Sequence, residues 1–353
     1  MSLKIAINGF GRIGRCVLRA IYERNLQNDI QVVAINELAD CETISYMLRY
    51  DSTHGRFPHA VHIENDCLTI QASSKSDSKV HSEKHAIRIV HQNEIATLPW
   101  AELNVDVVLE CTGQYKTRDE LTQHITAGAK KVVLSQPGEP DMDFTLIAGI
   151  NQNELHSDHQ LISVGSCSTN CVLPVMKVLQ DAYGIEAGVT TTIHSAMNDQ
   201  PVIDAYSSDL RRTRAAVTSI IPVDTALPKG ISRLMPHLEN KIESLHLRVP
   251  TLNVSAMDLS LQLNRATNSD EINALLKRKS ENELHNLIGY SQEPHASVDF
   301  NHDARSGVID ATQTRVSGDR LVKLLIWFDN EWGFANRMID CAQRIDRLVN
   351  QQA

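Results

Sequence analysis

The stretch Leu3-Lys-Ile-Ala-Ile7, followed at once by Asn8-Gly-Phe-Gly-Arg-Ile-Gly-Arg15, decides how the first half of the chain folds. The five apolar-rich residues predict a short strand, and the spacing of apolar side chains from Cys16 to Arg24 predicts a helix. Gln31-Val-Val-Ala-Ile35 predicts a second strand, with Glu37 just beyond it. The order of these features is that of a dinucleotide-binding unit: strand, G-x-G-x-x-G turn, helix, strand and acidic residue.

The glycines Gly9, Gly11 and Gly14 let the backbone turn tightly and approach a pyrophosphate, which rests on the helix N-terminus. Glu37 is expected to accept hydrogen bonds from the adenosine ribose hydroxyls. Its negative charge would repel a 2′-phosphate, so the pattern favours NAD over NADP as the cofactor. An ordinary glycine turn is the alternative interpretation of the motif when it occurs alone.

Further strands are expected at Val105–Leu109 and Lys131–Leu134, with a helix at Arg118–Ala127 between them. Such alternation predicts an α/β fold with a mostly parallel, doubly wound sheet. Ser135 follows the second of these strands, at the end of the strand where ligands bind in this architecture.

Ser166-Cys-Ser-Thr-Asn-Cys171 lies between an expected strand at Leu161–Val164 and an expected helix at Val172–Tyr183. Cys167 would then lie at a helix N-terminus, a position that can lower a cysteine pKa from about 8.5 into the range of about 3.5–7.5. We therefore expect a nucleophilic thiolate, although a lone cysteine is often only a small buried apolar residue. Cys171, one turn later on the apolar face, is expected in the core.

His194 follows the strand-like stretch Val189–Ile193. A single histidine is more often a surface or core residue than a catalyst. Together with Cys167 it becomes a candidate partner that stabilises the thiolate and then acts as acid or base.

A basic cluster, Asp209-Leu-Arg-Arg-Thr-Arg214, stands out in an acidic protein. It is either a solvated or subunit-contact surface or, together with Thr225 and Arg248, a site for phosphate, because guanidinium groups fit the oxyanion. Alternation at Leu252–Leu263 and Leu321–Phe328 predicts strands of a second sheet. Helices are expected at 270–279 and 334–349.

The composition is that of a globular protein, with 353 residues, 42% hydrophobic and 22% charged residues. The formal net charge of −9 argues against nucleic acid as the main partner. No stretch is long and apolar enough to suggest a membrane span, and the start has no signal-peptide layout. Seven cysteines at scattered spacings suit reduced thiols in the cytoplasm, and no metal site is expected. The serine-rich segment 73–84 is expected to be a solvated loop.

These segments together resemble the glyceraldehyde-3-phosphate dehydrogenase superfamily over nearly the whole chain. Five motifs carry the resemblance: Ile7-Asn-Gly-Phe-Gly-Arg-Ile-Gly-Arg15, Ser166-Cys-Ser-Thr-Asn-Cys171, Thr192-Ile-His-Ser195, Arg248-Val-Pro-Thr251 and Asp329-Asn-Glu-Trp-Gly333. The resemblance implies an NAD-binding domain at 1–166, completed by the C-terminal helix 334–353. It also implies an α+β catalytic and tetramerisation domain at 167–333, with a mostly antiparallel sheet, and a homotetramer.

The resemblance also implies residue roles. Cys167 is similar to the family's nucleophile and His194 to its acid–base partner, while Asn330 matches the residue that holds the nicotinamide carboxamide. Arg12 and Ile13 match cofactor contacts in the glycine turn. Arg248 and Asp199 match residues that bind the substrate's terminal phosphate in the family. A second anion site of the family is matched by Ser166, Ser168, Arg212 and Thr225.

Departures from the commoner family pattern look like its erythrose-4-phosphate dehydrogenase branch. Met197 stands where the glycolytic enzyme usually has a threonine, and Ala226 and Ser168 replace a usual glycine and threonine. The branch implies oxidation of D-erythrose 4-phosphate to 4-phospho-D-erythronate through a thioester hydrolysed by water, in pyridoxal phosphate synthesis. Three alternatives stay open: a phosphorylating glyceraldehyde-3-phosphate dehydrogenase, a non-catalytic NAD-binding protein and a cysteine hydrolase.

Overall fold

The computed structural model describes residues 2–71 and 86–350, so the serine-rich segment 73–84 lies outside the described residues. The chain divides into two compact units. Unit 1 takes its residues from 1–146, 152–165 and 335–353, and unit 2 comprises 147–151 and 166–334. Among the described residues, no helix combines the length and the apolar composition needed to cross a membrane.

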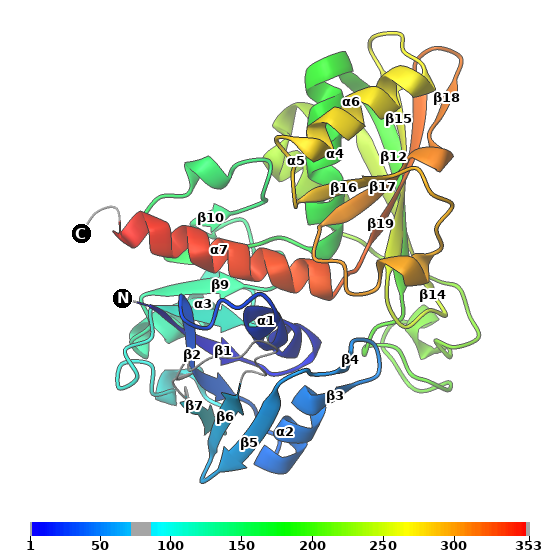
Figure 1. Cartoon of the computed structure of the whole chain (residues 1–353). Helices are drawn as coiled ribbons and strands as arrows, with labels where there is room; N and C mark the ends of the chain where they lie inside the picture. The colour runs from blue at the N-terminus through cyan, green and yellow to red at the C-terminus, as the bar shows by residue number, and fades with distance from the viewer. Residues whose placement is uncertain (1, 72–85, 351–353) are drawn as a thin grey trace, which may run out of the picture. The chain divides into compact units, whose positions relative to one another are not determined.

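Unit 1 is built on one large sheet (Figure 1). Within the described residues its strands lie in the order β10 (Phe144–Thr145), β11 (Leu161–Ser163), β9 (Lys131–Leu134), β8 (Val107–Glu110), β1 (Leu3–Asn8), β2 (Ile30–Asn36), β7 (Ala86–Val90), β6 (Cys67–Gln71) and β5 (Ala60–Glu64). All neighbours from β10 to β7 are parallel, and the two pairs beyond β7 are antiparallel. This arrangement confirms the predicted doubly wound, mostly parallel sheet.

The helices of unit 1 are α1 (Arg12–Glu23), α2 (Cys41–Arg49), α3 (Arg118–Thr126) and α7 (Trp332–Asn350), the last from Ala335 onward. Helix α7 lies beside the end of α1, where Arg24 donates to Asn336 Oδ1 at 3.0 Å and to Asp340 Oδ1 at 3.2 Å. The last segment of the chain thus belongs to the same unit as the first. Short elements complete the unit: β3 (Tyr50–Asp51), β4 (Gly55–Arg56), η1 (Ile95–Thr97) and η2 (Gln152–Glu154).

A buried polar network ties together the strand ends that carry the glycine turn. The Glu110 carboxylate, fully buried, accepts from Asn8 Nδ2 at 2.6 Å and contacts His124 Nε2 at 3.1 Å. Asn36 in turn donates to Asn8 Oδ1 at 2.7 Å, and the Trp100 indole N–H donates to His124 Nδ1 at 3.0 Å. Because buried polar groups are costly when unpaired, this network fixes the relative positions of β1, β2, β8 and α3.

Unit 2 has a second, mostly antiparallel sheet. Within the described residues its strands lie in the order β13 (Ile221–Val223), β14 (Ile242–Val249), β12 (Ile185–Ser195), β15 (Ser255–Leu263), β19 (Leu321–Phe328), β17 (Gly307–Asp310) and β16 (Ile288–Ser291), with β18 (Arg315–Ser317) also on β19. The β12–β14 and β16–β17 pairs are parallel, and the rest are antiparallel. The predicted fold class is confirmed for this unit as well.

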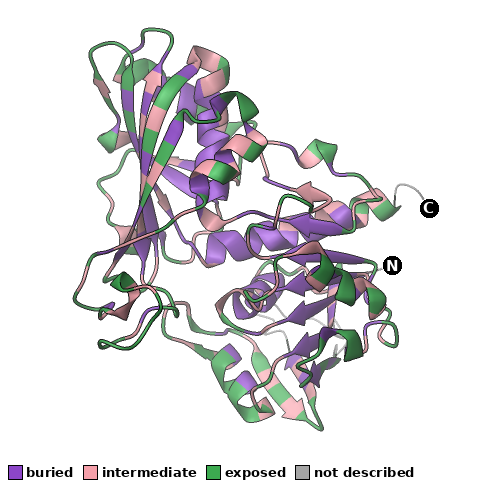
Figure 2. Ribbon diagram, turned by 180° about the vertical axis from the view of Figure 1, so that it is seen from behind, coloured by how far each residue is buried: buried purple, intermediate pink, exposed green. Residues whose placement is uncertain are grey.

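One face of the second sheet is covered and the other is largely open. Helices α4 (Cys167–Tyr183), α5 (Leu227–Leu234) and α6 (Ser269–Glu281) lie on the covered face (Figure 1). Side chains therefore alternate between buried and accessible along β15 and β19, whereas β8 and β9 of unit 1 are buried throughout (Figure 2). The remaining turns of this unit are η3 (Arg211–Thr213), η4 (Pro236–Leu238), η5 (Ser297–Phe300) and η6 (Ala311–Gln313).

Candidate active site

Cys167 is the first residue of α4, five residues before the expected start of that helix. Ser166 caps the helix: its hydroxyl accepts from the Thr169 backbone N–H, and the Thr169 hydroxyl accepts from Ser166 N at 2.7 Å. This capping box fixes the start of the helix, so the sulfur lies beside backbone N–H groups that the helix itself does not use. Cys171, one turn later, is fully buried, as the sequence predicted.

His194 reaches Cys167 from strand β12. Its Nε2 lies 3.7 Å from Cys167 Sγ, and its ring is 2% exposed. Nδ1 lies 2.8 Å from the Ser195 carbonyl oxygen. Because a carbonyl only accepts, we assign the proton to Nδ1, which leaves the Nε2 lone pair facing the thiol. The geometry therefore places a base next to the sulfur.

Burial opposes the expected thiolate–imidazolium pair. Burial raises the pKa of the Cys167 thiol, although the Ser168 hydroxyl, the Arg248 charge and the backbone N–H groups at the helix start all act to lower it. Burial also lowers the pKa of His194 to about 4, and the nearby Arg248 charge lowers it further. Desolvation thus favours the neutral form of both groups, and it opposes the helix-terminus effect on which the sequence argument relied.

Arg248 lies next to His194 in the parallel β12–β14 register. Its guanidinium Nη1 is 3.3 Å from His194 Nδ1 and 3.5 Å from the Ser195 oxygen, to which it is oriented to donate. The side chain is 8% exposed, makes no ion pair with any described residue, and its buried Nε has no hydrogen-bond partner. A buried cation in this state is expected to be stabilised by an anionic ligand.

His246 is a site residue that the sequence reasoning missed. Its ring stacks on that of His194, with centroids 5.1 Å apart, and its buried Nε2 has no hydrogen-bond partner among the described residues. Burial lowers the pKa of His246 to about 3, helped by His194, Arg248 and Arg212. The signal was available: His246 precedes Arg248 by two residues, and positions two apart in a strand share a face.

Among the expected anion-site residues of unit 2, Arg212 lies with Asp199, and Ser166 lies with Ser168 at the start of α4. Arg212 Nη1 pairs with Asp199 Oδ2 at 2.9 Å, so these two are brought together, and their charges act on Arg248. Ser168, nearly buried, interacts with the Cys167 sulfur, while Ser166 is committed to the helix cap.

Thr225 lies at the start of α5, where its hydroxyl accepts from Leu227 N at 3.2 Å. Helix α5 packs close to the start of α4, since a Cβ on Gly230 would lie 2.8 Å from Thr169 Cγ2. Next to Asp199, the amide of Gln200 is buried with neither its nitrogen nor its oxygen paired. Polar groups without partners therefore remain in this part of the unit.

Asn330 lies just after β19, and its amide orientation is fixed by two hydroxyls. Its Oδ1 accepts from Ser195 Oγ at 3.0 Å and from Ser255 Oγ at 2.9 Å. None of the described residues accepts a hydrogen bond from its Nδ2, so that group can donate to a ligand.

The glycine turn of unit 1 has the geometry expected for a dinucleotide. Gly9 has φ +87°, and a Cβ on it would lie 2.6 Å from Thr112 N. A Cβ on Gly14 would lie 2.3 Å from the Gly9 oxygen. A Cβ on Gly11 would meet no described residue within 4 Å, so the turn is open at the residue that directly precedes α1. The cradle fits a pyrophosphate held at a helix N-terminus.

The other cofactor candidates surround this turn. Glu37 follows β2, and its carboxylate accepts from Phe10 N at 2.9 Å and Leu38 N at 2.7 Å. Arg12 and Ile13 form the first helical positions of α1, and Arg12 pairs with Asp51. Burial alone would raise the pKa of Asp51, but hydrogen bonds from Arg12 and from the backbone lower it overall.

Ser135 follows β9, and its N–H donates to the Glu110 oxygen at 3.0 Å. Its hydroxyl interacts with the buried thiol of Cys111, on the neighbouring strand end. The residue thus lies at the carboxyl edge of the sheet, as expected from the sequence.

Two family models match the chain. The model described as glyceraldehyde 3-phosphate dehydrogenase, NAD binding domain, matches residues 3–118. The model described as glyceraldehyde 3-phosphate dehydrogenase, C-terminal domain, matches residues 166–330. The first match takes in the glycine turn and Glu37, so the cofactor is NAD, as predicted. The second takes in Cys167, His194, Arg248 and Asn330.

Proposed function

Because the chain belongs to the glyceraldehyde-3-phosphate dehydrogenase family and is therefore an NAD-dependent dehydrogenase, we propose that its substrate is D-erythrose 4-phosphate. The product is 4-phospho-D-erythronate, which serves pyridoxal phosphate synthesis in the cytoplasm. The main support for reaction at an aldehyde is the distance of 3.7 Å between Cys167 Sγ, at the start of α4, and His194 Nε2.

Cys167 is the nucleophile in this proposal. Its sulfur adds to the aldehyde carbon while His194 Nε2 takes the thiol proton and passes it to the carbonyl oxygen, which gives a hemithioacetal on Cys167. His194 then removes that hydroxyl proton as a hydride leaves the carbon, and the carbon becomes a thioester. Bound NAD supplies the hydride acceptor. Backbone N–H groups at the start of α4 stabilise the negative oxygen during both steps.

The phosphate of the substrate accounts for the unpaired cation. Arg248 is buried without an ion pair among the described residues, and the neighbouring Arg212 and unpaired Gln200 amide add donors. A sugar phosphate bound here presents its dianion to Arg248, and so its aldehyde approaches Cys167. His246 contributes by stacking on His194, which limits rotation of the catalytic ring.

Water rather than phosphate releases the product in this proposal. Two residues weaken the second anion site: Ala226, at the start of α5, makes no side-chain cap, and Ser168 is engaged with Cys167. Met197, 45% exposed, has no hydroxyl to offer the substrate's terminal phosphate. His194 is then the base that activates the attacking water. The phosphorylating alternative is favoured only by Arg212 and Thr225, which both keep polar groups that an inorganic phosphate could use.

We also propose a homotetramer. Strongly exposed apolar side chains gather in the segment before β13: Val202 at 69%, Ile203 at 77%, Leu210 at 82% and Ile220 at 66%. Val189 on β12 and Leu245 on β14 add exposed apolar groups on the open face of the second sheet. Large exposed apolar areas are typical of association surfaces, and further copies of this chain would cover them.

The test is NADH formation from D-erythrose 4-phosphate and from glyceraldehyde 3-phosphate, each with and without inorganic phosphate. We expect higher kcat/KM for erythrose 4-phosphate and little stimulation by phosphate. A preference for glyceraldehyde 3-phosphate with an obligatory phosphate requirement would establish the phosphorylating alternative instead.

A further inference from the structure

Three side chains with metal-binding groups meet in unit 1, at the start of α2. Cys41 Sγ lies 3.2 Å from Asp66 Oδ1 and 3.7 Å from His91 Nε2. The three ligand atoms all lie within 4.8 Å of one another. No sequence motif indicates this cluster, because Asp66 and His91 are 25 and 50 residues from Cys41.

Each residue is held by the backbone of a different element. Cys41 is the first residue of α2, whose start is fixed by the Asp40 side chain accepting from Thr43 N at 2.8 Å. Asp66 lies in the tight turn between β5 and β6, where it and Asn65 have φ of 56° and 49°. These angles are those of a type I′ hairpin turn. The backbone of these elements thus fixes the positions of Cys41 and Asp66.

His91 is oriented by a contact outside the cluster. It directly follows β7, and its Nδ1 lies 2.8 Å from the Glu37 carbonyl oxygen. Because a carbonyl only accepts, Nδ1 carries the proton, and the Nε2 lone pair faces Cys41. Histidines that bind metals in proteins are usually oriented in this way, with the second ring nitrogen donating to a carbonyl or carboxylate.

The distances fit one coordination geometry. A tetrahedral zinc, with Zn–S near ~2.3 Å and Zn–N or Zn–O near ~2.0 Å, separates sulfur from each lighter ligand atom by about 3.5 Å. The observed separations of 3.2 and 3.7 Å lie on either side of that value. A thiolate, an imidazole and a carboxylate together also suit a borderline-soft divalent ion better than magnesium or calcium.

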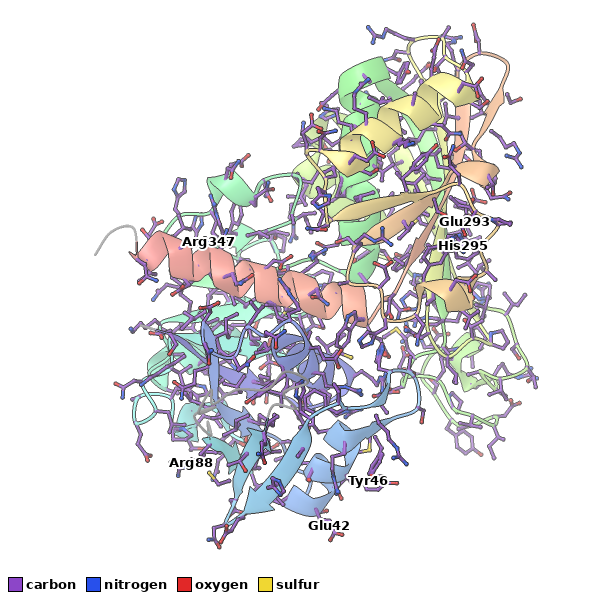
Figure 3. The ribbon with its side chains drawn as sticks, viewed as in Figure 1. Glu42, Tyr46, Arg88, Glu293, His295 and Arg347 are labelled. Atoms are coloured by element: carbon purple, nitrogen blue, oxygen red, sulfur yellow. The ribbon has the colours of Figure 1, made fainter. Side chains whose placement is uncertain are left out.

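We propose that Cys41, Asp66 and His91 bind a thiophilic divalent cation of the zinc type, with the fourth position left to solvent. Asp66 and His91 are exposed and Cys41 is partly exposed, so the ion has an entry path. The surroundings confirm that this is the outer side of the unit: Glu42 and Tyr46 of α2 project away from the ribbon, as does Arg88 of β7 (Figure 3). The site is independent of the proposed reaction, because it uses neither Cys167 nor His194.

The test is a Co²⁺ titration of the full-length Cys167→Ser protein, followed by competition with Zn²⁺. The Cys167→Ser background removes the thiol–imidazole pair of the candidate active site, which would also take these ions. We expect one equivalent of cobalt per chain, a thiolate-to-cobalt charge-transfer band, and displacement by zinc. Loss of a direct ligand in Cys41→Ser or His91→Gln is expected to weaken binding by at least about 100-fold, since even outer contacts are worth ~10–100-fold.

The matched control is Cys67→Ser, which removes a partly buried thiol directly after Asp66 in the chain. It should leave the band and the affinity unchanged, and far-UV circular dichroism should show that all variants are folded. If the Cys167→Ser protein gives no thiolate band, the proposal is wrong. A band that survives Cys41→Ser would place the ion on another cysteine and would equally overturn the assignment.

Discussion

Acid sensitivity of unit 2 should come largely from two stacked histidines. Burial lowers the pKa of His194 to about 4 and that of His246 to about 3, from an ordinary 6.5. The folded state therefore binds fewer protons than the unfolded state between these values and pH 6.5. Stability contributed by the neutral rings is complete above pH 6.5 and is lost as the pH falls through this window.

The magnitude follows from the same values. At pH 5 the unfolded chain protonates both rings almost completely, whereas the folded chain keeps them neutral. At about 1.4 kcal/mol for each pH unit below 6.5, each ring lowers the free energy of unfolding by about 2 kcal/mol at pH 5.

The perturbation is His246→Gln, and the assay is urea unfolding of the full-length protein at pH 7 and pH 5, at one protein concentration. We expect the variant to lose about 2 kcal/mol less than the unchanged protein between the two pH values. His237→Gln is the control, because His237 is an exposed histidine of the same unit. Equal losses in His246→Gln and in the unchanged protein would refute the reasoning.

Cys167→Ser should abolish NADH formation while NAD binding, followed by fluorescence titration, stays intact; substantial turnover would remove Cys167 from the mechanism. Cys171→Ala should keep most activity and lower the free energy of unfolding by about 1 kcal/mol, because it deletes one fully buried sulfur. Glu37→Gln should reduce the preference for NAD over NADP by about tenfold, or ~1.4 kcal/mol, and an unchanged ratio of Kd values would argue against the ribose role. Gly11→Ala should fold normally, since its Cβ meets only open space, but should bind NAD weakly. Gly14→Ala should also lower the free energy of unfolding by about 1–3 kcal/mol, because its Cβ would overlap the Gly9 oxygen.

Local patterns in the sequence determined the elements and their class. Short β-branched runs and helical spacing predicted β1, α1, β2 and β9, because the side-chain periods of strands and helices are properties of a few consecutive residues. The glycine motif was equally local, although its packing is not: a Cβ on Gly14 would meet Gly9, a neighbour in the chain, whereas a Cβ on Gly9 would meet Cys111 and Thr112, just beyond β8. The family motifs then predicted the NAD site.

Tertiary structure decided how the site behaves. The β12–β14 register placed Arg248 beside His194, and it also brought His246 onto the His194 ring, a contact between residues 52 positions apart. Cys41, Asp66 and His91 likewise meet only because three separate backbone elements converge. The balance of effects on the Cys167 thiol likewise depends on tertiary structure. A helix N-terminus acts over one turn and is visible in the sequence, whereas the desolvation that raises the pKa of Cys167 depends on every element packed around it.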